Sequence, residues 1–188
     1  MHRSRTFTAL ATIAMTLGAG LATSAAADAA PGYVGQVDAA GGLAAHYVPA
    51  AAAPRYGGYG DGTRLTLVCK VRSVSIGGND LWYLVHGSKR RWVSARYVDN
   101  VGPAPRFCGD GRNSTARVTA ARLNRREAPT LRAATDGVLA RGARVSVVCW
   151  VDGLGQAAGD TRWYQLASGS WVSADHIGAT KRRVELCA

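Results

Sequence analysis

An internal repeat is the feature of this chain that most constrains its fold. Each copy contains a β-like run ending in Cys, then a Trp-Tyr pair, then the tetrapeptide Trp-Val-Ser-Ala, and then a second Cys. These elements lie at residues 65–69, 82–83, 92–95 and 108 in the first copy, and at 145–149, 163–164, 171–174 and 187 in the second. A long block that recurs in this way indicates one structural unit made twice. The sequence therefore predicts two small domains.

The first 27 residues have the pattern of a secretory signal peptide. Arg3 and Arg5 give a basic start, an apolar run covers residues 9–21, and an Ala-x-Ala cleavage pattern ends at Ala27. A membrane anchor is the alternative, but threonines and glycines interrupt the run, which is also short for a span. No other stretch is apolar enough to cross a membrane, so we expect a secreted mature chain of about 160 residues without a transmembrane segment.

The four cysteines predict two disulfide bonds. Four cysteines in a secreted chain allow three pairings, and the repeat favours Cys69–Cys108 with Cys149–Cys187, because the separations of 39 and 38 positions are nearly equal. Each bond would remove chain entropy worth about 4 kcal/mol from the unfolded state.

The repeat also sets the expected domain boundaries. We expect the first domain at residues 34–108, a linker at 109–115 and the second domain at 116–187. Neither copy has a helical pattern, and short alternating runs separated by glycine-containing turns indicate strands. In residues 65–69 and 145–149 the alternation places each Cys on the inward face of its strand. The predicted fold class is therefore all-β, with two small, partly open β-barrels.

The second copy resembles the bacterial SH3 (SH3b) family. The matching elements are Leu123-Asn124-Arg125-Arg126 followed by Pro129, Gly142 in a turn, a valine-rich strand at 145–148, Trp163-Tyr164, and Trp171-Val172. The resemblance implies two SH3-like barrels in tandem and a secreted or wall-associated binding module, often one that recognises peptidoglycan. The first copy is a degenerate version, because Leu43-Ala44-Ala45-His46 replaces the Leu-Asn-x-Arg element. The expected binding residues in the first loop of the second copy are Asn124, Arg125 and Arg126.

Tryptophan side chains are further candidates for a binding surface. Trp82, Trp150 and Trp163 can either fill the core or stack on a sugar or peptide, and we expect Trp163 to be partly exposed if Tyr164 faces the core. Trp150 directly follows a cysteine, so strand alternation places it on the outer face. Trp92 and Trp171 are expected in the core.

The chain lacks the residue patterns of an enzyme. A Cys-His hydrolase needs a free thiolate beside a His, but the repeat accounts for all four cysteines. His46, His86 and His176 lie in unrelated segments, without the spacing of a zinc protease. No Gly-x-Ser-x-Gly elbow or glycine-rich phosphate loop occurs. We therefore expect a non-enzymatic protein without a metal or cofactor.

The mature chain is strongly basic. The signal segment holds two of the 23 Lys and Arg residues and none of the 12 Asp and Glu residues, which leaves 21 against 12 and a net charge of +9. Such a charge either maintains solubility or attracts anionic polymers. We expect the partner to be peptidoglycan or an anionic wall polymer, and we do not expect specific nucleic-acid binding. The alternative is a secreted module that binds another protein, as an inhibitor or effector does.

Overall fold

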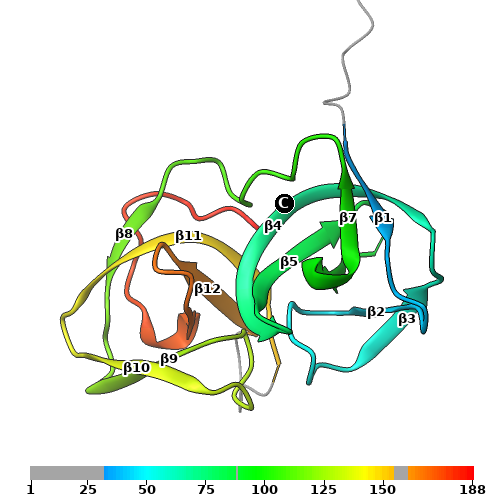
Figure 1. The fold of residues 1–188 in the computed structure, drawn as a ribbon. Helices are drawn as coiled ribbons and strands as arrows, with labels where there is room; N and C mark the ends of the chain where they lie inside the picture. Colours follow the sequence, from blue (N-terminus) through cyan, green and yellow to red (C-terminus); the bar gives the residue numbers. More distant parts are fainter. Residues whose placement is uncertain (1–31, 88, 155–160) are drawn as a thin grey trace, which may run out of the picture. The chain divides into compact units, whose positions relative to one another are not determined.

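The computed structural model describes residues 32–87, 89–154 and 161–188. The predicted signal peptide, residues 1–27, lies outside these residues. Both repeats belong to one compact unit, Pro31–Ala188, which contains two antiparallel sheets and two disulfide bonds (Figure 1). The predicted all-β class is confirmed at this level. Within the described ranges, no helix is long and apolar enough to cross a membrane.

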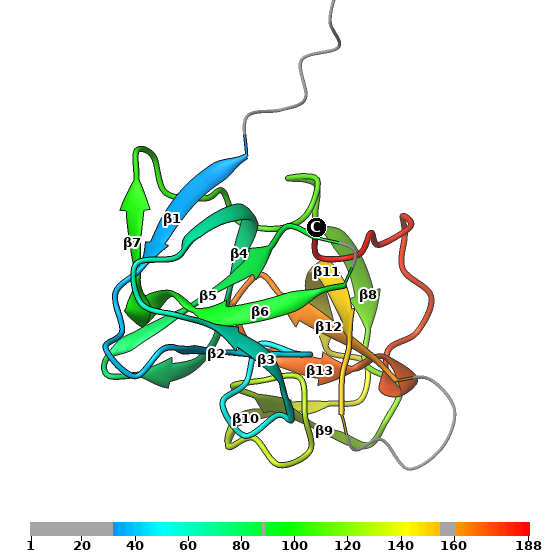
Figure 2. The same cartoon turned by 90° about the vertical axis from the view of Figure 1, so that its right-hand side faces the viewer.

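The first repeat forms a seven-stranded sheet. Its strands are β1 (Tyr33–Val37), β2 (Leu43–His46), β3 (Arg55–Tyr59), β4 (Arg64–Ile76), β5 (Asn79–Val85), β6 (Arg91–Ser94) and β7 (Val98–Val101). They are hydrogen-bonded in the order β3-β2-β6-β5-β4-β1-β7, which can be followed in Figure 2. A single 3₁₀ turn, η1 (Ala95–Tyr97), separates β6 from β7. Three of these six pairs join sequence neighbours, whereas β2–β6, β4–β1 and β1–β7 join strands that are distant in sequence.

The second repeat forms a six-stranded sheet with matching topology. Its strands are β8 (Ser114–Arg117), β9 (Arg122–Arg126), β10 (Thr135–Ala140), β11 (Arg144–Asp152), β12 (Arg162–Leu166) and β13 (Trp171–Ser173), followed by the 3₁₀ turn η2 (Ala174–His176). The order is β10-β9-β13-β12-β11-β8, so β9 joins β13 as β2 joins β6. β8 begins at Ser114, within the segment predicted as a linker.

The long strands β4 and β11 show the predicted alternation. In β4, Leu65, Leu67 and Cys69 are buried, and Val145, Val147 and Cys149 are buried in β11. In each strand the register to its neighbour shifts just before the Cys. Such a bulge lets a strand bend, and both strands curve visibly in Figure 1. The two cysteines are buried as predicted, but beyond the bulge they belong to a different cluster from Leu67 and Val147, so they do not share the inward face of the residues before it.

The disulfide pairing predicted from the repeat is also confirmed. Cys69 is bonded to Cys108 and Cys149 to Cys187. The chain before each second Cys adds a short parallel bridge to the long strand, Lys70 with Phe107 and Trp150 with Leu186. Two buried disulfides indicate that the chain folds in an oxidising compartment.

The core has three principal parts. One cluster fills the inside of the first sheet, around Leu67, Tyr83 and Val93, and a second fills the inside of the second sheet, around Val147, Leu166 and Val172. A third cluster contains residues of both repeats. Its members are both disulfides, Val71, Trp82, Leu84 and Trp92 from the first repeat, and Val151, Trp163 and Trp171 from the second. The central strands β5, β6, β12 and β13 therefore bury residues on both faces.

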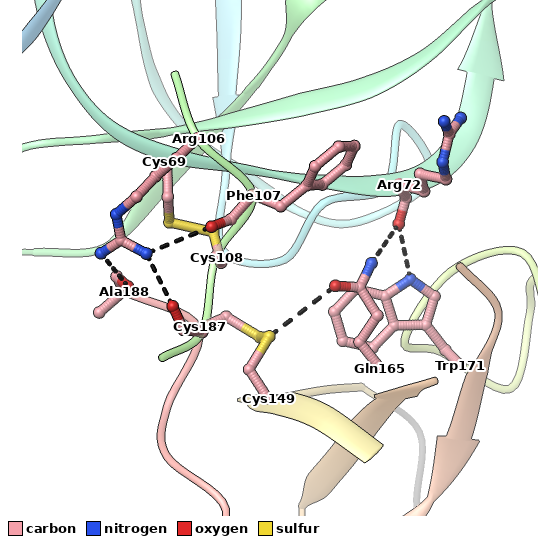
Figure 3. The surroundings of a disulfide bond; sticks show 11 residues. Cys69, Arg72, Arg106, Phe107, Cys108, Cys149, Gln165, Trp171, Cys187 and Ala188 are labelled. Carbon is pink, nitrogen blue, oxygen red and sulfur yellow. Dashed lines mark hydrogen bonds between the residues drawn. A yellow bond between two sulfur atoms is a disulfide. The ribbon is translucent and has the colours of Figure 1, made fainter. Parts of the chain in front are cut away.

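Hydrogen bonds also cross between the repeats within this shared cluster. The main-chain carbonyl of Arg72 accepts from the Gln165 side chain at 3.1 Å and from the Trp171 indole at 3.0 Å (Figure 3). Gln165 and Trp171 are 5% and 0% exposed, so these polar groups satisfy one another where water has little access. Trp92 and Trp171 are buried as expected, but in the cluster shared by the repeats and not in the core inside either sheet.

Candidate functional site

The structure corrects the expected exposure of two tryptophans. Trp82 and Trp163 are each 1% exposed, because the face on which they lie packs against the other repeat. Trp82 donates a hydrogen bond to the Val74 carbonyl at 2.9 Å. Neither indole is accessible for stacking on a ligand.

Trp150 lies on the opposite face of its sheet from Trp163. Trp150 is paired with Tyr164, while Val151 is paired with Trp163, and successive side chains in a strand point to opposite faces. Trp150 is half-buried, with the Arg162 guanidinium 4.4 Å from its ring centroid. Trp150 is therefore on the same side of the sheet as Tyr164, so the bulge before Cys149 reverses its expected outward orientation, and Trp150 does not share a groove with Trp163.

The predicted first-loop residues of the second repeat lie on β9, and its two arginines are held by local contacts. Arg125 donates to the Asp136 carbonyl at 3.0 Å and lies 3.7 Å from the Asp136 carboxylate. Arg126 donates to the Ala133 carbonyl at 2.8 Å, whereas Asn124 is exposed. The arginines join β9 to the chain leading into β10, so part of their hydrogen-bonding capacity is already used by the fold.

A different cluster of aromatic and basic residues lies on the first repeat. The register pairs His46 with both Arg55 and Trp92. Tyr47 and Tyr56 follow His46 and Arg55, Arg91 precedes Trp92, and both Tyr47 and Arg91 contact the Tyr56 ring. These three side chains are therefore neighbours across β2, β3 and β6. With Lys89 and Arg90 from the turn before β6, they form what we call the tyrosine–cation cluster: Tyr47, Tyr56, Lys89, Arg90 and Arg91.

The rings and cations of this cluster are in direct contact. The Tyr47 and Tyr56 ring centroids are 4.2 Å apart, and the Lys89 ammonium and Arg91 guanidinium lie 5.1 and 5.3 Å from the Tyr56 centroid. Hydrogen bonding with Lys89 lowers the pKa of Tyr56 and raises that of Lys89. Tyr47 is 48% exposed, so the cluster presents an aromatic surface to solvent.

The positive charge of the tyrosine–cation cluster is less compensated than that of the other basic segments. In the tail, Arg182 pairs with Asp110 at 3.1 Å and Arg183 with Glu185 at 3.5 Å. Within the part of the chain that the structure describes, no carboxylate forms an ion pair with Lys89, Arg90 or Arg91. Desolvation lowers the pKa of Arg90, while the charge of Asp152 acts in the opposite direction.

A pocket of about 300 Å³ lies beside this cluster. The first repeat contributes Tyr47, Val48, Lys89, Arg90 and Trp92, and the second contributes the end of β11 and the residues after it, 151–154. The pocket therefore combines an apolar floor with cations at its rim. Pockets that orient ligands commonly have such a combination.

The histidines do not form a site with other chemistry-bearing groups. His46 is buried, its Nδ1 lies 3.0 Å from the Ala53 carbonyl, and its ring packs edge-on against Trp82. His86 and His176 are exposed. Among the described residues, no group of three or more His, Cys, Asp or Glu could hold a metal ion.

Comparison with known proteins adds no relative: no family model matches the chain, and no curated protein matches it. The functional argument therefore depends on the site itself. The sequence analysis did not single out Tyr47 and Tyr56. A usable signal exists in the repeat, because Glu127 and Asp136 occupy the equivalent positions of the second copy.

Proposed function

We propose that the protein is a secreted, non-enzymatic envelope-binding protein made of two SH3-like barrels, and that it recognises peptidoglycan or an anionic wall polymer. The observation that carries this proposal is the tyrosine–cation cluster beside its pocket. The exposed Tyr47 ring offers a flat apolar face to a sugar ring. Three cations that form no ion pair with a described carboxylate attract carboxylate or phosphate groups, and arginine binds both in a bidentate manner.

The bulk charge supports the same ligand class. The chain carries 23 Lys and Arg against 12 Asp and Glu, so long-range attraction brings polyanions to the surface before specific contacts form. Long-range attraction of this kind weakens as salt shortens the Debye length, to about 8 Å at physiological ionic strength. Binding is therefore expected to depend on salt.

Co-sedimentation of the purified mature protein with insoluble cell wall tests the proposal. We expect the wild type to pellet at low salt and to be released progressively as salt is added. The Tyr47→Ala and Lys89→Gln variants should bind more weakly, with Tyr47→Ala about two- to tenfold lower in affinity, the range for an aromatic contact.

Matched controls are available on the same chain. Tyr97 is also an exposed tyrosine beside an arginine, 39% exposed with Arg96 at 5.7 Å, and Lys181 is an exposed lysine outside the cluster. Tyr97→Ala and Lys181→Gln should therefore bind like the wild type. No pelleting at low salt, together with one stoichiometric protein partner captured from culture supernatant, would replace this proposal by a protein-binding function.

A further inference from the structure

The pocket beside the tyrosine–cation cluster has a counterpart related by the internal repeat. A second pocket, of about 260 Å³, is lined by Glu127, Asp136 and residues 168–170 of the second repeat, and by Arg72, Ser73, Ser75 and Asp80 of the first. In the first pocket, residues 47, 48, 89, 90 and 92 of the first repeat face residues 151–154 of the second. In the second pocket, residues 127, 136 and 168–170 of the second repeat face residues 72, 73, 75 and 80 of the first. Each pocket is therefore built from both repeats.

The strand register shows that the two pockets occupy equivalent places. His46 pairs with Arg55 and Trp92 in the first sheet, and Arg126 pairs with Thr135 and Trp171 in the second. Tyr47 therefore corresponds to Glu127, and Tyr56 to Asp136. By the same alignment, residues 89–91 correspond to residues 168–170, which are Ser-Gly-Ser.

The chemistry of the two pockets is opposite. At the equivalent positions, two tyrosines and three cations in the first repeat are replaced by two acids and no cation in the second. The acidic pocket does include Arg72, but its guanidinium is paired with Asp80 at 2.6 Å. Asp136 is likewise paired with Arg125 at 3.7 Å, so the second pocket has no unpaired cation among its described residues. An anionic ligand is therefore attracted to the first pocket and not to the second.

We propose that the protein has one composite site for an acidic sugar chain, formed by the tyrosine–cation cluster of the first repeat and residues 151–154 of the second. This inference rests on the proposed envelope-binding function and makes it more specific: the ligand has both sugar rings and negative charges. The two repeats do not act as two independent weak sites. They make one anion-binding site, and the equivalent second site has lost that property.

Asp152 is the residue that distinguishes a composite site from one confined to the first repeat. It belongs to the second repeat, is exposed, and lines the same pocket as Arg90. Its negative charge opposes the entry of an anion. Its Oδ1 accepts a hydrogen bond from the Thr161 hydroxyl at 3.1 Å, which keeps the carboxylate at the end of β11.

Hydrogen bonds fix the residues that the second repeat contributes to the pocket. The Gly153 amide donates to the Thr161 carbonyl at 2.7 Å, and the Leu154 amide donates to the Pro129 carbonyl at 3.1 Å. Leu154 also packs with Val48 of the first repeat in a small apolar cluster below the pocket. The distance across the site is therefore determined by packing between the repeats.

The test is titration calorimetry of the mature protein with a short galacturonic acid oligomer of defined length. We expect one oligomer per protein molecule. Asp152→Asn should tighten binding about two- to fivefold, the range expected for one exposed charge pair. Glu127→Gln makes the same change in net charge in the other pocket, so it should leave affinity and stoichiometry unchanged.

Two further probes separate the contribution of the rings from that of the charges. Polyphosphate carries charge without rings, so its affinity should not respond to Tyr47→Ala, whereas an uncharged dextran oligomer should not bind measurably. Two oligomers per molecule, or equal effects of Asp152→Asn and Glu127→Gln, would overturn the composite site even if the wild type pellets with cell wall. Failure of the wild type to bind the galacturonic acid oligomer while pelleting with wall would overturn the ligand class and leave envelope binding intact.

Discussion

Removing the disulfide of the second repeat is expected to destabilise the first repeat as well. Cys149 and Cys187 are 0% exposed and lie in the same cluster as Cys69, Trp82 and Trp92 of the first repeat. This shared cluster is the main core on the outer faces of the central strands. If its packing in one repeat is lost, the other repeat exposes its tryptophans to water.

The size of the effect follows from the length of the loop that the disulfide closes. The bonded cysteines are 38 positions apart, and in the chain-entropy description such a link stabilises the fold by about 4 kcal/mol. The Cys149→Ala/Cys187→Ala variant should therefore lose about this much free energy of unfolding. Cys69→Ala/Cys108→Ala, with a separation of 39, is the matched variant and should lose a similar amount.

The assay is urea unfolding combined with hydrogen exchange read peptide by peptide. Each variant should give one transition, and exchange protection should fall by the same free energy in β4 and β11, because slow amides in a cooperative unit exchange through global unfolding. One result would contradict coupling between the repeats. If Cys149→Ala/Cys187→Ala lowered protection in β11 while β4 kept its wild-type rates, the repeats would unfold independently and the shared core would not couple them.

Other predictions concern the pocket wall and the tyrosine–cation cluster. A Cβ at Gly153 would overlap the Trp163 ring and the Pro129 carbonyl, so Gly153→Ala should cost about 1–3 kcal/mol in urea unfolding; Gly41→Ala, with no atom nearby, should change stability by less than about 0.5 kcal/mol. Because hydrogen bonding with Lys89 lowers the pKa of Tyr56, Lys89→Met should raise the pKa of Tyr56 as followed by NMR of the ring carbons. An unchanged titration would show that Lys89 does not contact the phenol. In the wild type, acidic-sugar affinity should fall as pH rises through the Tyr56 pKa, since the phenolate adds a negative charge.

The features predicted correctly from the sequence are those that depend on local pattern or on the repeat. Alternation in residues 65–69 and 145–149 was enough to predict which side chains are buried, both cysteines included, because side chains of a strand alternate between its faces. The disulfide pairing followed from nearly equal separations in two copies of one unit. Neither inference requires knowledge of what covers the outside of a sheet.

The errors concern contacts between segments that are distant in sequence. Alternation distinguishes the two faces of β12, but it cannot show that the outer face of Trp163 is covered by the first repeat. The tyrosine–cation cluster was missed for a related reason. Tyr47, Tyr56 and Arg91 become neighbours only because β2 pairs with both β3 and β6, and this strand order is not visible in local sequence.

The shared core also gives a physical reason for the doubled tryptophan pattern. Each repeat has two such tryptophans, one in the Trp-Tyr pair and one in Trp-Val-Ser-Ala. Both lie on the face that meets the other repeat, while the Tyr or Val that follows each of them faces the repeat's own core. A large apolar residue at such a position is unfavourable on an isolated barrel, because it would leave an exposed apolar patch. The same four tryptophans are 0–1% exposed when the repeats pack together. The tryptophans that reveal the duplication are therefore also the residues that pack the two repeats together. The differences on which the proposed binding site depends lie at the margin of that interface, where Tyr47 faces solvent and Glu127 takes its place in the second copy.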